Sequence, residues 1–381
     1  MSKLNDLIKE MCPNGVEYVK LEELVDYIQP AKYIVKNTNY DIKYDVPVLT
    51  AGQTFILGYT NEKDGIYYAS ADNSVIIFDD FTTSNHWVDF NFKVKSSAMK
   101  ILISKTDNLF KYIYYCISNI DYIPKEHSRQ WIQVYSQFPI PLPPLKVQEK
   151  IVKILDKFGE LEAELEAELE VRKNQYEFWR EKLLNRGNFN QQYITLGDIG
   201  KVCMCKRIMK NETSDSGDVP FYKIGTFGKQ ADAYISYDIF NDYKKRFSYP
   251  KKGEILVSCS GTIGRSVVFD GNDAYFQDSN IVWLEHDESI VLNKYLLYSY
   301  SLNPWNISNG GTIARLYNDN ILKAVIPVPT IEDQIKIIKV LDNFDKICNS
   351  LMDGLPAEIE ARQKQYEYYR DKLLTFKELK V

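Results

Sequence analysis

The chain has 381 residues, a hydrophobic content of 45% and a net charge of −5. This length allows two or three domains with cores of their own, and the composition is ordinary for a globular protein. The acidic balance excludes a simple basic nucleic-acid binder, so any nucleic-acid contact must come from local basic clusters or from added subunits. No apolar run approaches the ~20 residues that span a bilayer, and the N-terminal stretch MSKLNDLIKEM has no signal-peptide core.

The first part of the chain reads as a mixed α/β domain. A short amphipathic helix over residues 1–15 is expected to end at the turn Cys12-Pro13-Asn14-Gly15. Apolar runs at Val46–Leu49 and Val75–Phe78 predict strands, and Leu109–Ile120 predicts a Tyr-rich helix. Loops rich in Thr, Ser, Asn and Gln lie between these elements.

Two pairs of blocks repeat within the chain. IPLPPLKVQEKIVKILDKF at 140–158 returns as IPVPTIEDQIKIIKVLDNF at 326–344, and RKNQYEFWREKLL at 172–184 returns as RQKQYEYYRDKLL at 362–374. Apolar residues within and between the blocks recur at steps of three, four or seven, which is coiled-coil spacing. We therefore expect long helices near 146–185 and 332–375. In the second, Asp353-Gly354-Leu355-Pro356 predicts the end of one helix and the start of another.

The segments before the two helices also resemble each other, more loosely. Tyr18-Val19-Lys20-Leu21 matches Tyr193-Ile194-Thr195-Leu196, and Arg129 and Arg315 stand at the same distance before each helix. We divide the chain into a domain at 1–139, a helical spacer at 140–187, a second domain at 188–325 and a second spacer at 326–381. This pattern suggests a fixed scaffold with two independently varied domains, and the plainer alternative is an ordinary helical hairpin.

The second domain contains the sharpest local motif. Lys251–Ser258 reads as a turn into a buried strand, followed by Ser260-Gly261-Thr262-Ile263-Gly264-Arg265. Glycines let backbone N–H groups approach a phosphate, and an arginine offers a bidentate fork to phosphate or guanine. A tight turn with no ligand explains the same glycines. Asn309-Gly310-Gly311-Thr312 with Arg315 forms a second such loop.

Basic clusters lie in the same domain, at Lys206-Arg207-Lys210 and Lys244-Lys245-Arg246. They would suit phosphate contacts, although charge runs are more often simply solvated. Signatures of catalysis are absent from the sequence, which has no GxxxxGK[ST] loop, no glycine-rich dinucleotide fingerprint and no triad. The six cysteines have no zinc-ligand spacing, so we expect reduced thiols in a cytoplasmic protein that binds no metal.

The duplicated blocks resemble the specificity (S) subunits of type I restriction–modification systems. The resemblance covers the whole chain. It rests on Pro141-Leu142-Pro143-Pro144 with Gln148, Pro327 and Pro329 with Gln334, Gln175-Tyr176, Gln365-Tyr366, the Lys-Leu-Leu ends at 182–184 and 372–374, the N-terminal Leu7–Tyr18 stretch and Gly253-Glu254-Ile255-Leu256.

That resemblance implies an α+β fold, with two mixed α/β target-recognition domains separated by two long antiparallel helices, a coiled coil with a pseudo-twofold axis. It implies a non-catalytic subunit that recognises a bipartite double-stranded DNA site with a non-specific gap. Its partners would be DNA, two copies of a methyltransferase subunit and restriction subunits. The chain itself would hold no cofactor, because S-adenosylmethionine would be bound by the methyltransferase. A coiled-coil scaffold without a DNA role and an enzyme with an unrecognised site are the alternatives.

We name candidate residues for both kinds of contact. The candidates for DNA binding are polar or basic loop residues: Gln53, Thr54, Thr83, Ser84, Asn85, Lys125, His127, Arg129, Lys206, Arg207, Ser260, Thr262, Arg265, Asn309, Thr312 and Arg315. The candidates for partner binding are aromatic residues near helix ends: Tyr176, Trp179, Tyr366 and Tyr369. The alternative is that all four fill the seam between the helices. The sequence does not say which basic residues would read bases and which would contact phosphates.

Overall fold

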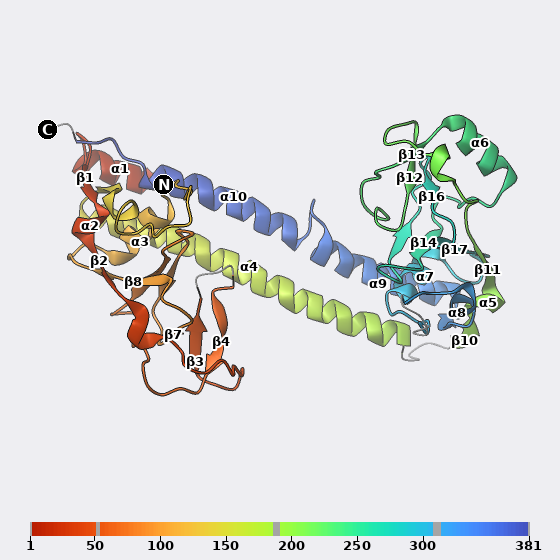
Figure 1. The fold of residues 1–381 in the computed structure, drawn as a ribbon, viewed down its shortest axis with the longest axis horizontal. Helices are drawn as coiled ribbons and strands as arrows, with labels where there is room; N and C mark the ends of the chain where they lie inside the picture. Colours follow the sequence, from red (N-terminus) through yellow and green to blue (C-terminus); the bar gives the residue numbers. More distant parts are fainter. Residues whose placement is uncertain (1, 51–53, 186–190, 308–313, 380–381) are drawn as a thin grey trace. The chain divides into compact units, whose positions relative to one another are not determined.

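A computed structural model describes residues 2–50, 54–185, 191–307 and 314–379. The chain forms two compact units, one made of Met1–Glu166 with Glu358–Val381 and the other of Ala167–Ala357. Each unit contains a mixed α/β domain and segments of long helix (Figure 1). The expected α+β class with two domains and long helices is confirmed. The expected boundaries between domains and spacers are not the boundaries of these units, and they stay predictions.

The first unit is built around a four-stranded antiparallel sheet in the order β2-β8-β5-β6. A second sheet has the order β4-β3-β7, and β1 pairs with β9. The strands are β1 (Glu17–Lys20), β2 (Val25–Ile28), β3 (Val46–Leu49), β4 (Ile56–Thr60), β5 (Val75–Asp79), β6 (Asn85–Val88), β7 (Lys93–Val94), β8 (Met99–Ser104) and β9 (Pro139–Leu142). The helices are α1 (Ser2–Met11), α2 (Leu21–Leu24), α3 (Phe110–Ser118), the start of α4 (Leu145–Asn185) and most of α10 (Leu355–Leu374).

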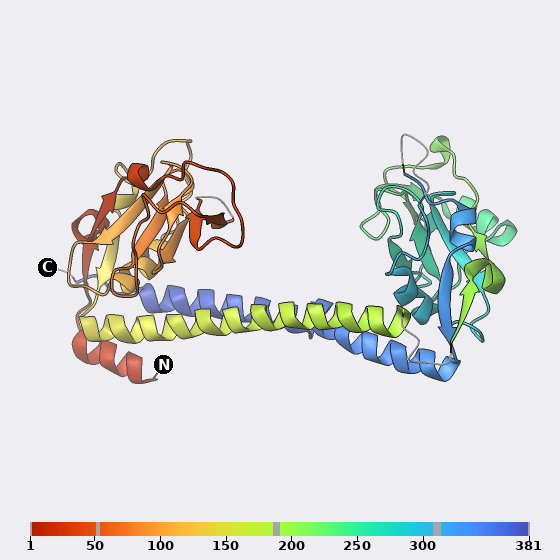
Figure 2. The same ribbon diagram turned by 90° about the horizontal axis from the view of Figure 1, so that it is seen from below.

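The four-stranded sheet buries both faces. Ile76 and Phe78 point toward the helices, whereas Val75 and Ile77 point toward the second sheet. This alternation follows from the period of two along a strand. All five residues of β5 are buried, so the sheet is a central layer. Helix α1 packs against α4 through Leu4, on the side away from the sheet (Figure 2).

The second unit repeats this plan. Its four-stranded sheet has the order β11-β17-β14-β15, its second sheet has the order β13-β12-β16, and β10 pairs with β18. The strands are β10 (Gln191–Thr195), β11 (Gly200–Cys203), β12 (Val219–Tyr222), β13 (Tyr234–Ile235), β14 (Ile255–Ser258), β15 (Ser266–Val268), β16 (Tyr275–Phe276), β17 (Ile281–His286) and β18 (Val325–Pro329). The helices are α5 (Leu196–Ile199), α6 (Tyr237–Arg246), α7 (Asn293–Tyr300), α8 (Asn318–Leu322), α9 (Ile331–Asn349) and the end of α4.

The long helices pack antiparallel within each unit. In the first, Phe158 of α4 stacks on Tyr369 of α10, and Gln363 donates to Glu162 at 2.7 Å, further along α4. In the second, Tyr176 of α4 stacks on Phe344 of α9. The expected break between two C-terminal helices is confirmed, because α9 ends at Asn349 and α10 begins at Leu355.

Each domain is fastened to its long helix by the same set of hydrogen bonds. In the first unit, Tyr112 of α3 donates to the Pro141 carbonyl at 3.0 Å, and Tyr115 donates to Asp156 at 2.6 Å. Gln148, 1% exposed, accepts from the Leu109 N–H and donates to the Pro143 carbonyl.

The second unit makes the equivalent bonds. Tyr295 of α7 donates to Pro327, Tyr298 donates to Asp342, and Gln334 joins Leu292 to Pro329. The recurring Pro-x-Pro and Gln signature is therefore the joint between domain and helix. Of the signature prolines, Pro141 lies in strand β9, and Pro327 and Pro329 lie in strand β18.

Candidate functional site

The turn after β5 in the first unit is held by its own side chains. Asp79 accepts from the N–H groups of Phe81 and Thr82 and from the Thr82 hydroxyl, at 2.8, 3.3 and 2.7 Å. Thr83 has φ of 64°, a left-handed conformation that is uncommon for a residue other than glycine. The loop from Lys125 to Arg129 lies beside this turn, because the His127 ring stacks on Phe81 at 4.6 Å.

Beneath the turn lies a buried ion pair. The carboxylate of Asp80 and the ammonium of Lys100 on β8 are 3.3 Å apart, and both side chains are 1% exposed. Arg129, whose side chain is 52% exposed, places Nη1 at 3.9 Å from the same carboxylate. Lys100 also lies over the Tyr27 ring. Asp80 thus joins a buried cation to an exposed arginine that is available to a ligand.

Other candidates of the first domain surround this turn. The hydroxyl oxygens of Thr82 and Ser84 lie 3.2 Å apart, and Ser118 donates to Asn85 at 2.6 Å. Lys125 is exposed on the neighbouring loop. Thr54 is exposed at the start of the segment before β4, and Gln53 lies outside the described residues.

The glycine motif of the second domain forms a turn after β14. Gly261 and Gly264 have φ of 63° and 82°, so both use a conformation that favours glycine. The Ser258 hydroxyl donates to the Thr262 carbonyl inside the turn. Arg265 donates to the Phe227 carbonyl at 2.9 Å and to the Thr262 hydroxyl at 3.3 Å. The turn predicted from the glycines is present, and the hydrogen bonds of Arg265 stabilise it.

A polar cavity of about 250 Å³ lies beside this turn, with Arg207 on one wall and Arg315 on another. Arg207 donates from Nε to Asp278 at 3.0 Å, and Arg315 donates from Nη2 to the Ser279 carbonyl at 2.8 Å. Ser260 donates to Asn280 at 2.9 Å. The loop between β16 and β17 therefore brings together three candidates that lie far apart in the sequence.

Sequence reasoning missed the residues of that loop. Gln277, Asp278, Ser279 and Asn280 all line the cavity, and Ser279 has φ of 60°. The available signal was a run of polar residues between two short apolar strands. In the first domain, Asp80 and Lys100 were missed as well, because Asp80 directly follows a strand-like apolar run and Lys100 stands inside one.

Two of the remaining candidates, Lys206 and Thr262, lie apart from the cavity lining. Lys206 lies over the Phe247 ring, with Nζ 5.2 Å from the ring centre. Thr262 belongs to the glycine turn. Asn309 and Thr312 lie outside the described residues.

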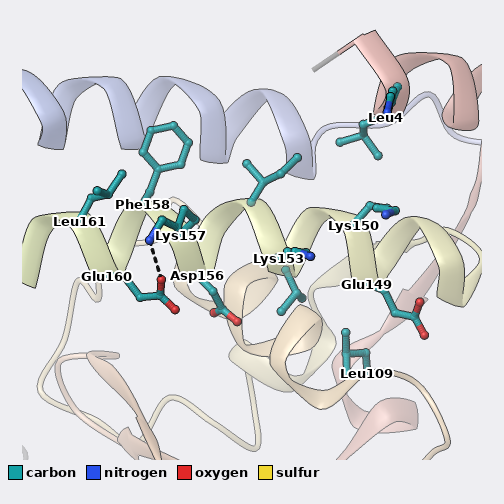
Figure 3. A pocket seen from close by; sticks show the side chains of 13 residues that line it. Leu4, Leu109, Glu149, Lys150, Lys153, Asp156, Lys157, Phe158, Glu160 and Leu161 are labelled. Atoms are coloured by element: carbon teal, nitrogen blue, oxygen red, sulfur yellow. Dashed lines mark hydrogen bonds and ion pairs between the residues drawn. The ribbon is translucent and has the colours of Figure 1, made fainter.

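The long helices carry a second kind of surface. In the first unit, a groove of about 780 Å³ runs along α4 between α1 and the segment before α3. Figure 3 shows Leu4, Leu109, Phe158 and Leu161 among alternating charges, including the Lys157–Glu160 pair. The lining of the groove therefore combines apolar and charged side chains.

The four aromatic candidates divide into two groups. Tyr176, Tyr366 and Tyr369 are partly buried in the helix seams. Trp179 is 38% exposed, with the Lys182 ammonium 4.8 Å from its ring centre. The sequence did not single out Phe178 and Tyr368, which are 59% and 60% exposed and occupy equivalent positions in the repeated blocks.

Comparison with known proteins agrees with this architecture. A family model described as the type I restriction modification DNA specificity domain matches residues 13–171 and again 190–361. The chain belongs to this family. It is a DNA specificity subunit of the type I restriction–modification class, and such subunits are non-catalytic.

Relatives of the specificity subunit share nearly its whole length. A type I restriction enzyme specificity subunit of Haemophilus influenzae is 45% identical over 95% of this chain and 96% of its own. One from Escherichia coli is 40% identical over 99% of this chain and 98% of its own. The S subunit of M. genitalium has the same fold, with a TM-score of 0.56 at 13% identity over 94% of this chain and 96% of that one.

The described residues of this specificity subunit contain no group of His, Cys, Asp or Glu arranged to hold a metal ion. All six cysteines are free. Burial raises the pKa of the Cys259 thiol to about 11, so this cysteine is a poor nucleophile at neutral pH. No helix in the described part of the chain is long and apolar enough to cross a bilayer.

Proposed function

We propose that this specificity subunit reads a bipartite double-stranded DNA site, one half with each domain, and that a non-specific gap separates the halves. The observation that carries this proposal is the equivalence of Arg129 and Arg315. The residue after Arg129 donates its N–H to Asp80, and the residue after Arg315 donates its N–H to Cys259. Asp80 and Cys259 each follow the matching central strand, so each domain offers one arginine at the same place.

The groups around each arginine support DNA recognition. A guanidinium with free N–H groups binds phosphate or the acceptor edge of guanine. Each arginine stands beside a polar turn that contains a residue with positive φ, Thr83 in one domain and Ser279 in the other. Strained backbone of this kind clusters at binding sites.

We also propose that methyltransferase subunits dock on the helices, one on each repeat. In the first unit Ile154 and Leu161 line the groove. Their counterparts in the repeated block, Val340 and Ile347, are each 39% exposed on α9. Apolar positions that are at least partly accessible in both repeats fit two copies of one partner.

The catalytic chemistry then belongs to the partners. S-adenosylmethionine would be bound by the methyltransferase, and restriction subunits would join the same assembly. The E. coli relative is named as a subunit of a type I restriction enzyme. The role left to this chain is to choose the DNA sequence and to hold the assembly on it.

Methylome sequencing of cells that express the chain with its methyltransferase tests the proposal. Wild type is expected to methylate one bipartite site. Arg129→Ala is expected to relax or abolish recognition of one half only, and Arg315→Ala of the other half only. Arg362→Ala, on the surface of α10, is the matched control and should leave the site unchanged. Methylation without a fixed site, or both variants altering the same half, would contradict the proposal.

A further inference from the structure

We propose that the cavity between Arg207 and Arg315 reads a guanine through the N7 and O6 acceptors of its major-groove edge. This proposal rests on the proposed function, and it adds which base the second domain selects and which side chain selects it. Gln277 is that side chain. Recognition of a base depends on which groups of the cavity remain available for a ligand.

Gln277 presents a donor to the cavity. Its Oε1 accepts from the backbone N–H of Ile224 at 3.0 Å. Because an N–H group can only donate, this bond fixes the orientation of the amide. The Nε2 group has no hydrogen-bond partner among the described residues. The backbone N–H of Gln277 donates to the Tyr222 carbonyl, and the Gln277 carbonyl accepts from the N–H of Ile281. These bonds hold the residue, and with it the amide, in place before any ligand arrives.

The other polar groups are mostly donors too. Arg207 uses Nε for Asp278 and Arg315 uses Nη2 for Ser279, which leaves further N–H groups on each guanidinium. Asn280 accepts from Ser260 through Oδ1, so its amide nitrogen remains. An arginine side chain cannot accept a hydrogen bond at all.

Among the described residues of the lining, Asp278 carries the one carboxylate, and this carboxylate is already engaged. Asp278 accepts from Arg207 at 3.0 Å and lies 3.4 Å from the Ser279 hydroxyl. Its side chain is only 17% exposed. The cavity therefore faces a ligand with donors and with little acceptor capacity.

Guanine suits such a site better than the other bases. In the major groove, guanine presents two acceptors, N7 and O6, whereas adenine and cytosine each present an amino donor and thymine presents one acceptor and a methyl group. Ile208 and Phe221 supply apolar walls on the same cavity. A fixed amide between such walls suits a flat base edge. A phosphate, which also presents only acceptors, is the competing source of the same chemistry.

The first experiment changes the DNA rather than the protein. Once methylome sequencing has given the site, and the Arg129 and Arg315 variants have assigned its halves, each guanine of the second half is replaced in turn by 7-deazaguanine. The full complex with methyltransferase is then titrated with each duplex. One replacement is expected to weaken binding about fivefold or more, because it removes the N7 acceptor but keeps base pairing. A second half without guanine, or equal binding of every 7-deaza duplex, would overturn the proposal.

The second experiment uses Gln277→Glu, which keeps Oε1 for the Ile224 N–H but replaces the Nε2 donor by an acceptor. We expect the preference for guanine at that one position to fall about tenfold and to shift toward cytosine, whose amino group donates. Gln192→Glu, which makes the same charge change on exposed β10 outside the cavity lining, should leave the preference unchanged.

The two experiments separate the competing explanations. If the cavity held a phosphate, Gln277→Glu would weaken binding equally for all sequences and would change the salt dependence, which would overturn guanine reading. Unchanged base preference in a folded Gln277→Glu complex would overturn it as well. Failure of the proposed function looks different, because the wild-type complex would then show no fixed site at all.

Discussion

Cys259 of the second domain occupies the position that Asp80 occupies in the first. Asp80 donates its N–H to the Ala98 carbonyl and accepts from the N–H of Gln130, and Cys259 makes the same two bonds with Asn280 and Leu316. Lys100 pairs with Phe78 across the sheet, and Val282 pairs with Val257 at the equivalent place. The buried ion pair of the first domain is thus replaced by Cys259 and Val282 in the second. The arginine above each position is held differently, by a carboxylate for Arg129 and by a carbonyl for Arg315.

The buried ion pair predicts that neutralising one of its two charges strongly lowers the stability of the protein. Asp80→Asn leaves the Lys100 ammonium buried without its counter-charge, and we expect a loss of about 3–5 kcal/mol in the free energy of unfolding. The double variant Asp80→Cys, Lys100→Val gives the first domain the residue types that the second domain has at these positions. It should lower the free energy of unfolding less than Asp80→Asn does. Urea unfolding measures both, with exposed Asp72→Asn as the control. A double variant as unstable as the single one would show that the charges are not the cause.

Arg265 and Arg315 should behave differently although both are arginines of the second domain that donate to a backbone carbonyl. Arg265→Ala removes the bonds to Phe227 and Thr262, so we expect a loss of stability of about 1–3 kcal/mol and only a secondary effect on DNA. Arg315→Ala should change DNA binding more than stability. Thermal unfolding and DNA titration at several salt concentrations separate the two. Equal stability losses would argue against distinct roles.

The joint between domain and helix predicts a stability effect in both units. Tyr115→Phe removes the hydrogen bond to the Asp156 carboxylate, and Tyr298→Phe removes the equivalent bond to Asp342. Each substitution is expected to lower the free energy of unfolding by about 1–3 kcal/mol, since hydrogen bonds to charged groups stabilise a protein more than those between neutral groups. Denaturant unfolding of the full chain gives the value. Tyr193→Phe, at an exposed site on β10, is the matched control and should cost little.

The exposed aromatic positions predict the docking surface. Phe178→Ser and Tyr368→Ser should each weaken the affinity for the methyltransferase, because buried aromatic contacts dominate interfaces. The double variant should bind no more than traces of it. Analytical ultracentrifugation gives the number of copies bound. If each single variant still binds two copies with unchanged affinity, docking occurs elsewhere.

The helix α4 contains LEAELEAE at 161–168, a tandem unit of four residues. Deleting Leu165–Glu168 shortens a helix by about 6 Å, which on B-DNA is between one and two steps of about 3.4 Å. If α4 sets the spacing, both half-sites should persist while the gap shrinks by about one base pair. Methylome sequencing decides, because an active variant with the original gap, or with altered half-sites, would rule out this role.

The helices and the core strands could be predicted from the sequence because their signals are local. The seven-residue spacing marks α4, and Gly354 with Pro356 marks the break before α10. The cavity could not be predicted in the same way. Arg207, Gln277 and Arg315 meet only because antiparallel strands bring distant turns together, and no local pattern records that pairing.

The sequence pattern also does not predict how a side-chain amide is oriented. Nothing in the sequence says that Gln277 receives the N–H of Ile224, and yet this contact determines which end of the amide faces outward. In the same way Ser279 looks like any loop serine until its φ angle is known. Glycines in the neighbouring turn were found because glycine itself is the signal.

The hydrogen bonds from tyrosine and glutamine that join each domain to its long helix have a consequence for how the gene can evolve. They involve backbone carbonyls, a glutamine and an aspartate that recur in both repeats, and none of them touches the cavity or the turn around Arg129. A DNA segment encoding one domain could therefore be exchanged between related genes, with its cut points at these joints, and the product would keep the hydrogen bonds between domain and helix. Recombination would then give a host a new recognition sequence in a single event, without passing through a non-functional intermediate.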